Sequence, residues 1–241
     1  MLKASIDLIK DLKKQKRNNS SLLFLDNLKI IKDAIKQGLK PKYILVEDEK
    51  ISEWEGYPVY KVDRKVIESL SDTKTPQGVV CVTEYTQHIP QKPNSNFLVL
   101  DHLQDPGNVG TLIRTATACG FESVFLIDSV SIANSKLIRS SVGTIFQNQV
   151  YSLTQEEFIS NIMKWNLPLL KADMNGENIF NLNFDNIVGV VIGNEGQGVC
   201  KAISSLCSIS VKIPMKKGVE SLNAAVSGSI IMYEIAKNNI K

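Results

Sequence analysis

The chain has 241 residues, of which 43% are hydrophobic and 22% charged, and its formal net charge is +3. This length suits one large or two modest domains with a substantial buried core. No apolar run approaches the roughly 18 to 20 residues of a membrane-spanning helix. The first residues mix acidic and basic side chains in a helical pattern, unlike a signal or transit peptide. We therefore expect a cytoplasmic protein without a membrane segment.

Cysteine and histidine content bounds the chemistry further. The four cysteines form no CxxC pair, and the chain has only two histidines. Zinc and iron sites usually show closely spaced cysteine and histidine ligands, so we expect no metal.

The positive charge is unevenly placed. Residues 1–90 carry 16 lysines and arginines against 13 aspartates and glutamates, whereas the remaining residues carry 12 of each. A basic cluster of this kind is as readily a solvated helix face as a nucleic-acid contact, so both readings stay open. Its members are Lys10, Lys13, Lys14, Lys16 and Arg17.

The first part of the chain predicts a small α/β domain. Apolar residues at helical spacing alternate with short runs rich in β-branched residues. The segment TQHIPQKPNSN is rich in prolines and amides and predicts a linker at 87–96, which separates domains 1–86 and 97–241. The predicted helices cover residues 5–14, 25–41 and 63–70, and the predicted strands cover 42–48, 58–62 and 78–85.

The second part alternates regularly between strands and helices. Its strands are nearly continuous apolar runs, which indicates a mainly parallel sheet covered by helices on both faces. Ligands of such sheets bind beyond the carboxyl ends of the strands. The predicted strands are 96–101, 123–128, 146–153, 168–173, 186–193 and 208–214. The predicted helices are 110–120, 134–143, 154–165, 199–207 and 222–237, and the loops to inspect are 101–110, 128–135, 172–178, 193–198 and 214–221.

The loop DPGNVG precedes the first of these helices. Its glycines free the backbone for close approach of another group. Asn108 is a possible helix cap, and Arg114 is expected to project from the helix flank near the loop.

Two further loops are unusual. IGNEGQGV has the spacing GxxGxG, not the dinucleotide-binding GxGxxG, and it carries the lone acid Glu195. In IPMKKGVESLN, Ser221 is a credible cap for the last helix, and Asn223 follows in its first turn. The small residues after Asn223 indicate a very close packing partner. The three loops together hold no acid–base histidine, nucleophilic cysteine or metal, which favours group transfer from a reactive cofactor.

DPGNVGTLIRTATACGF, VVIGNEGQGV and IPMKKGVESLNAAVSGSIIMYE together resemble the three signature motifs of the SpoU (TrmH-type) branch of the SPOUT methyltransferases. That family methylates ribose 2′-hydroxyls in RNA with S-adenosylmethionine. The resemblance covers residues 97–238. Residues 18–85 resemble more loosely the L30e-like substrate-binding domain of ribosomal-RNA members, with TPQGVVCV as the best-preserved piece.

The resemblance implies an α/β fold with a trefoil knot, a homodimer formed through the C-terminal domain, and an RNA substrate, with 23S ribosomal RNA favoured over tRNA. The final helix would lie in the dimer interface, which would explain its small residues. Cofactor contacts would come from the backbone around Gly193, Ile213 and Leu222. The implied catalytic residues are Asn108, Arg114, Glu195, Ser221 and Asn223, and the implied cofactor-binding residues are Ala172, Gly193, Asn194, Gly196, Ile213 and Leu222.

For the mechanism, a guanidinium with a pKa above about 12 is an awkward general base. The hypothesis is that Arg114 binds an RNA phosphate and aligns the hydroxyl, whose proton passes to that phosphate or to a transiently neutral arginine. Three alternatives stay open: a tRNA ribose methyltransferase, a non-catalytic RNA-binding protein of the same fold, and a nicotinamide dehydrogenase. The last is disfavoured because the chain lacks the ribose-binding acid of dinucleotide sites.

Overall fold

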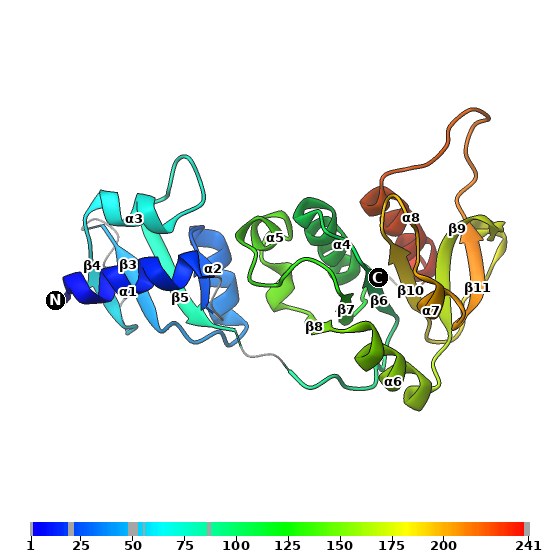
Figure 1. The fold of residues 1–241 in the computed structure, drawn as a ribbon, viewed down its shortest axis with the longest axis horizontal. Helices are drawn as coiled ribbons and strands as arrows, with labels where there is room; N and C mark the ends of the chain where they lie inside the picture. The colour runs from blue at the N-terminus through cyan, green and yellow to red at the C-terminus, as the bar shows by residue number, and fades with distance from the viewer. Residues whose placement is uncertain (1, 19–21, 48–52, 55, 86–87, 239–241) are drawn as a thin grey trace. The chain divides into compact units, whose positions relative to one another are not determined.

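The computed structural model describes residues 2–18, 22–47, 53–54, 56–85 and 88–238. The chain divides into two compact units (Figure 1). Unit 1 comprises Met1–Thr86 with Ala133–Phe146, and unit 2 comprises Gln87–Ile132 with Gln147–Lys241. Residues 86 and 87, at the start of the predicted linker, lie outside the described residues. None of the helices in the described ranges is long and apolar enough to cross a membrane.

Unit 1 is built on a mixed sheet. Five strands of its described residues lie in the order β1-β4-β3-β5-β2. The first three are parallel, and β5 is antiparallel to both of its neighbours. The predicted strands 42–48 and 78–85 contain β3 and β5, whose apolar residues are buried apart from the half-buried Tyr43. The elements are β1 (Leu2–Lys3), α1 (Ile6–Arg17), β2 (Leu22–Leu25), α2 (Leu28–Lys36), β3 (Tyr43–Val46), β4 (Val59–Lys61), α3 (Arg64–Leu70) and β5 (Val79–Glu84).

Strand β2 was not predicted from the sequence. Its apolar run joins the helical pattern that follows, so the predicted helix began at residue 25. In the structure the Asn27 side chain accepts a hydrogen bond from Ile30 N at 3.1 Å and starts α2 at Leu28. The preceding residues are thereby released to pair with β5. The helix ends at Lys36, before the predicted end at residue 41, and Gly38 follows with a φ of +92° that favours glycine.

The segment Ala133–Phe146 belongs to unit 1, although the sequence placed it in the second domain. It carries α5 (Ser135–Ser140), whose Ile138 is buried in the same core cluster as the residues of α2. Arg139 Nη1 lies 3.6 Å from Oδ2 of the buried Asp26. This packing involves partners more than 100 positions away in the sequence, so local pattern did not reveal it.

Unit 2 contains a parallel sheet, as predicted. Six strands of its described residues lie in the order β11-β9-β10-β6-β7-β8, and every neighbouring pair is parallel. The elements are β6 (Phe97–Asp101), α4 (Pro106–Ala118), β7 (Ser123–Ile127), β8 (Gln149–Leu153), α6 (Gln155–Trp165), β9 (Leu169–Asn178), β10 (Gly189–Gly193), α7 (Lys201–Ser204), β11 (Cys207–Lys212) and α8 (Ala224–Ala236).

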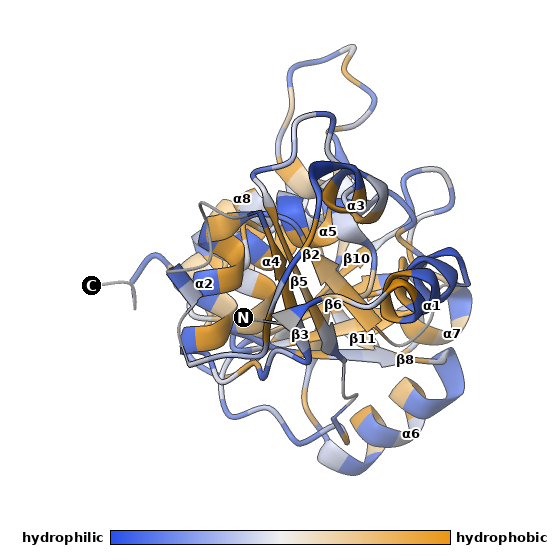
Figure 2. Cartoon of the chain, turned by 90° about the vertical axis from the view of Figure 1, so that its left-hand side faces the viewer, coloured by the Kyte–Doolittle hydropathy of each residue, from blue (hydrophilic) through white to orange (hydrophobic). Residues whose placement is uncertain are grey.

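Helices cover both faces of this sheet. All five residues of β6 are buried, and successive side chains of a strand point to opposite faces. On one face Phe125 packs against Phe158 and Trp165 of α6, with ring centroids 5.7 and 5.6 Å apart. Helices α4 and α8 pack against each other and against β6 and β10. Figure 2 shows α6 alternating between hydrophobic and hydrophilic residues, as a helix on a sheet surface should.

Candidate functional site

The DPGNVG segment is the first turn of α4. The helix begins at Pro106, and the Asp105 side chain caps it by accepting a hydrogen bond from Asn108 N at 2.8 Å. Asn108, which the sequence offered as a possible cap, therefore does not cap this helix. Proline is favoured at the first position of a helix because its missing N–H would be unpaired there anyway. Because Asp105 caps the helix, the Asn108 side chain is available to bind other residues.

Asn108 links the three motifs through its side chain. Its Nδ2 donates to Glu195 Oε1 at 2.7 Å, and its Oδ1 accepts from Asn223 Nδ2 at 3.1 Å. An amide has two donor hydrogens and two acceptor lone pairs, so one of each stays available for a ligand. Three of the five implied catalytic residues thus meet, although 87 and 115 positions separate the bonded pairs.

The GNEGQG loop is folded tightly on itself. The backbones of Asn194 and Gly198 exchange hydrogen bonds of 3.1 and 2.9 Å. A Cβ at Gly193 would lie 2.2 Å from the carbonyl carbon of Gly198, so only glycine fits. At Gly196 the same atom would meet only Asn194 Oδ1 at 3.6 Å, an ordinary contact. Gly193 and Gly196, both implied as cofactor-binding by the resemblance, therefore differ in their tolerance of a side chain.

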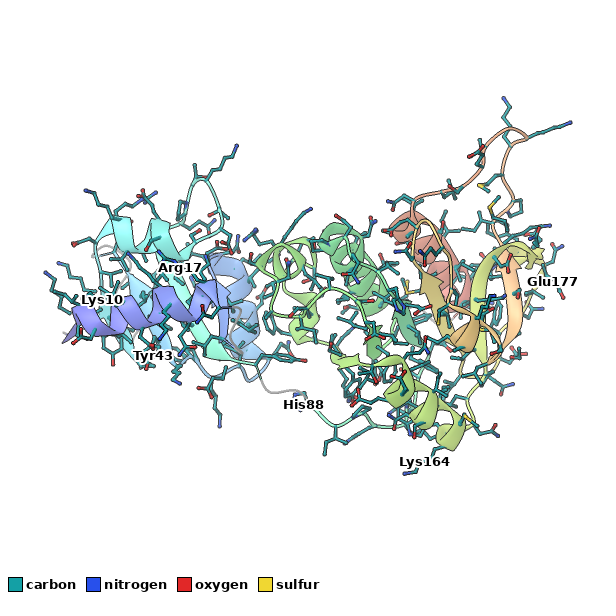
Figure 3. The ribbon with its side chains drawn as sticks, viewed as in Figure 1. Lys10, Arg17, Tyr43, His88, Lys164 and Glu177 are labelled. Carbon is teal, nitrogen blue, oxygen red and sulfur yellow. The ribbon has the colours of Figure 1, made fainter. Side chains whose placement is uncertain are left out.

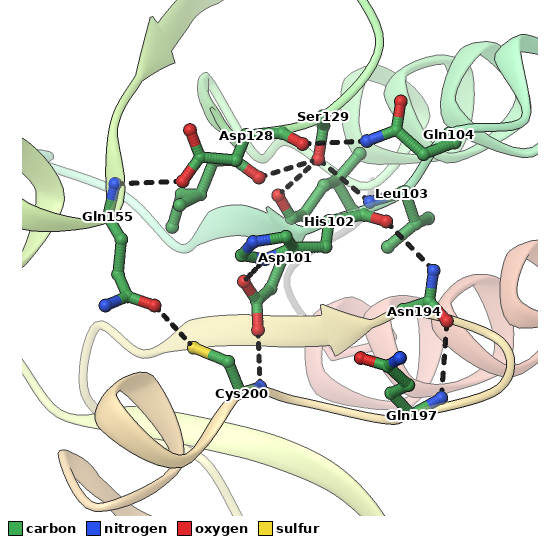
Figure 4. A network of polar contacts seen from close by, with 12 residues as sticks. Asp101, His102, Leu103, Gln104, Asp128, Ser129, Gln155, Asn194, Gln197 and Cys200 are labelled. Atoms are coloured by element: carbon green, nitrogen blue, oxygen red, sulfur yellow. Dashed lines mark hydrogen bonds and ion pairs between the residues drawn. The ribbon is translucent and has the colours of Figure 1, made fainter.

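Asn194 holds this loop to the sheet (Figure 4). Its Oδ1 accepts from the backbone of Gly196 and Gln197, and its Nδ2 donates to the carbonyl of His102 at 3.1 Å. The fully buried Asp101 accepts from Cys200 N at 2.7 Å, and its other oxygen lies 2.6 Å from His102 Nδ1. The carboxyl ends of β6 and β10 are therefore joined by polar contacts.

The last helix is capped by Asn223, whose Oδ1 accepts from Ala225 N and Val226 N at 2.9 and 3.2 Å. The prediction that Ser221 is the cap was wrong, because Asn223 lies two residues nearer to the helix start. The small residues of α8 do have a close partner, as expected. A Cβ at Gly228 would lie 2.4 Å from Leu112 Cδ2 of α4, so this close packing lies within the chain.

A pocket of about 670 Å³ lies beside the middle of β9, the carboxyl ends of β10 and β11, and the start of α8. Its volume is in the range typical of small-molecule sites. Ser221 lines it, although it does not cap the helix. Gly196 and Asn108 are not among the lining residues. The implied site residues that line the pocket are Ala172, Gly193, Asn194, Glu195, Ile213, Ser221, Leu222 and Asn223.

Arg114 stands apart from this group. It is exposed on α4 and does not line the pocket. Among the described residues its side chain has no hydrogen-bond or ion-pair partner. Six positions along a helix correspond to about 9 Å of rise and roughly 120° of rotation. Arg114 therefore faces a different direction from Asn108. The expectation that the two side chains lie together at one site does not hold within one chain.

Asp173 also lines the pocket, although the sequence did not single it out. Residues 172–178 were predicted as a loop, but they belong to β9, which pairs with β11 as far as Asn178. A hydrogen bond from Asn175 N, followed by the nearby Lys171, lowers the pKa of the Asp173 carboxyl. Asp173 therefore brings a stable negative charge to the pocket. In the described residues no three histidine, cysteine, aspartate or glutamate side chains cluster as metal ligands would.

The fold and pocket define an α/β protein whose ligand site lies at the carboxyl ends of parallel strands. The profile of the SpoU rRNA Methylase family matches residues 95–233. The chain belongs to this family. A second profile, that of the MRM3-like substrate binding domain, matches residues 3–81.

Two relatives illustrate the similarity. The 23S rRNA (guanosine(2553)-2′-O)-methyltransferase RlmP of Bacillus subtilis is 29% identical over 230 residues, which is 92% of this chain and 91% of that protein. A putative TrmH family tRNA/rRNA methyltransferase of Staphylococcus saprophyticus is 30% identical over 229 residues, 85% of this chain and 91% of that protein.

Solved structures share the whole fold. The AdoMet-bound rRNA methyltransferase from Sinorhizobium meliloti has a TM-score of 0.84 at 22% identity and covers 100% of this chain and 98% of its own. The SpoU methyltransferase AviRb from Streptomyces viridochromogenes, in complex with AdoMet, has a TM-score of 0.86 at 21% identity, with 99% of both chains covered. At these identities the likeness concerns the fold.

Proposed function

We propose that the protein is an S-adenosylmethionine-dependent RNA methyltransferase that modifies a ribose 2′-hydroxyl, with 23S ribosomal RNA as the substrate. The observation that carries the proposal is the Asn108 bridge, which joins Glu195 and Asn223 beside the pocket. A non-catalytic RNA-binding protein would have no use for three motif side chains held in this way. Family membership and the relative from Bacillus subtilis support the activity and the substrate.

The pocket suits the proposed cofactor in size and chemistry. Apolar side chains including Ile192, Ile213 and Leu222 line one part of it and suit a purine ring. The negative Asp173 suits a cationic ligand such as a sulfonium or an ammonium. Gly193 lets the backbone fold closely beside the ligand space. When bound, S-adenosylmethionine supplies a methyl group that its sulfonium already activates.

The protein's contribution is then positioning and electrostatics. Asn108 has an unused amide hydrogen and an acceptor lone pair, which can hydrogen-bond the ribose of the target nucleotide. Arg114 is exposed, and a guanidinium group can bind a phosphate in bidentate fashion. We propose that Arg114 aligns the 2′-hydroxyl by holding the adjacent phosphate. The Arg114→Lys variant tests this, because near-full activity with unchanged cofactor binding would contradict bidentate positioning.

We also propose a homodimer formed through unit 2. Arg114 does not reach the pocket of its own chain, so a second copy that brings Arg114 to the pocket would complete the site. Exposed apolar side chains on α8, Val226 at 47% and Tyr233 at 61%, support an interface there. A monomeric mass in light scattering at working concentration would contradict this proposal.

Three finer expectations belong to the same proposal. The C-terminal part would form a trefoil knot, unit 1 would be L30e-like, and the protein would act in the cytoplasm. The match of residues 3–81 to a substrate binding domain supports an RNA-binding role for unit 1. The division into Met1–Thr86 and Gln87–Lys241, apart from Ala133–Phe146, supports a domain boundary near the predicted linker.

Two experiments test the function. Calorimetric titration with S-adenosylmethionine separates an enzyme from a non-catalytic RNA-binding protein, which would show no binding. Ribose-methylation mapping of total RNA from a deletion strain identifies the substrate. The expected result is one missing 2′-O-methyl group in 23S ribosomal RNA. Loss of a methyl group in tRNA, with ribosomal RNA unchanged, would overturn the choice of substrate.

A further inference from the structure

The loop between β11 and α8 forms a defined turn at the edge of the pocket. It projects between these two elements in Figure 1. Val219 N donates to Lys216 O at 3.2 Å, and Gly218 has a φ of +95°. A turn with positive φ at its third residue requires glycine there, so this geometry is encoded in the sequence. The turn places Lys216 and Lys217 at adjacent positions, and both line the pocket.

Positive charge on this side of the pocket is not neutralised. Lys212, Lys216 and Lys217 are exposed, and none has an acidic partner among the described residues. Neither of the two acids that line the pocket pairs with these lysines. Asp173 lies 3.2 Å from Lys171, and Glu195 accepts from Asn108. Glu220 follows in the loop but does not line the pocket.

The arrangement of charge selects among anions. The proposed cofactor carries a single carboxylate, and the charge of three lysines would exceed the charge of that one group. An RNA strand offers one phosphate per nucleotide, so neighbouring lysines can each bind one. Lysine binds phosphate as a point charge without reading the base. We propose that Lys216 and Lys217, assisted by Lys212, bind the phosphate backbone of the substrate RNA beside the target nucleotide. This inference rests on the proposed function.

The test measures RNA binding separately from catalysis. The Lys216→Ala/Lys217→Ala variant is compared with wild type for affinity to an unmodified transcript of Bacillus subtilis 23S ribosomal RNA at several salt concentrations. Loss of two single-strand phosphate contacts should reduce the slope of log affinity against log salt by about 1.4, which corresponds to roughly tenfold weaker binding near 0.15 M salt. The KM for RNA should rise by a larger factor than the Kd for S-adenosylmethionine.

Two further variants make the result specific. Lys216→Arg/Lys217→Arg keeps both charges and should bind the transcript as wild type does. Lys164→Ala/Lys201→Ala removes two exposed lysines of unit 2 that do not line the pocket, and it should leave the salt slope unchanged. Lys164 lies on α6, well separated from the loop (Figure 3).

Several results would overturn the inference: an unchanged salt slope for the Lys216→Ala/Lys217→Ala variant, a larger loss of cofactor affinity than of RNA affinity, or an equal loss in the control variant. Failure of the proposed function is a different result. In that case the wild-type protein binds the transcript with the expected salt slope, but it neither binds S-adenosylmethionine nor transfers a methyl group.

Discussion

Gly193→Ala should weaken cofactor binding, because the added side chain collides with the backbone of the GNEGQG loop. The added Cβ would lie 2.2 Å from the carbonyl carbon of Gly198, where ordinary contact begins at 3.4 Å. The loop must therefore withdraw by about 1 Å. This movement strains the two hydrogen bonds between Asn194 and Gly198, of 3.1 and 2.9 Å. At about 0.5–1.5 kcal/mol each, their loss costs about 1–3 kcal/mol, or a 5- to 150-fold weaker Kd for the cofactor.

The assay is calorimetric titration with S-adenosylmethionine, with thermal unfolding followed in parallel to show that the variant folds. Gly196→Ala is the matched control, because its Cβ would meet only Asn194 Oδ1 at 3.6 Å. It should bind the cofactor within about twofold of wild type, since surface changes away from special features usually cost little. Equal Kd values for wild type and Gly193→Ala would refute the reasoning, and so would an equal loss in both variants.

Three further predictions follow from the site and the core. Asn108→Ala should lower the single-turnover rate of methyl transfer by on the order of 10²-fold, because the ribose is no longer positioned. Thr111→Ala, at an exposed position of the same helix, is the control. An unchanged rate for Asn108→Ala would contradict a role of the Asn108 bridge in methyl transfer. Gly228→Ala should lower the free energy of unfolding, measured by urea denaturation, by about 1–3 kcal/mol, since its Cβ would lie 2.4 Å from Leu112 Cδ2. Unaltered stability would show that α4 and α8 can move apart at little cost. Burial raises the pKa of the Cys81 thiol to about 12, so it should stay protonated at pH 8 and resist iodoacetamide in the native protein, and rapid alkylation seen by mass spectrometry would disprove this.

Much of unit 2 was predictable because its information is local. Continuous apolar strands alternating with amphipathic helices indicated a parallel sheet with both faces covered, and the structure confirms this. The carboxyl ends of such strands share one edge, and two of the five predicted loops, 193–198 and 214–221, line the pocket found there. The close partner expected for the small residues of the last helix is also present, at Gly228.

Other features depended on contacts that sequence alone does not contain. Helix starts were misplaced because neighbouring polar residues compete for the capping position, so Asp105 and Asn223 cap the helices for which Asn108 and Ser221 were candidates. The strand β9 continues through a predicted loop because β11 is available to pair with it.

The sequence by itself determined the residue types of the site, the order of its motifs and the absence of an acid–base histidine or nucleophilic cysteine in the three loops. Only the tertiary structure decided which of these residues meet. Asn108 joins Glu195 and Asn223 across 87 and 115 positions, while Arg114 on the same helix faces away. The physical reason is that a helix rotates by about 100° per residue, so neighbours in a motif need not be neighbours in space.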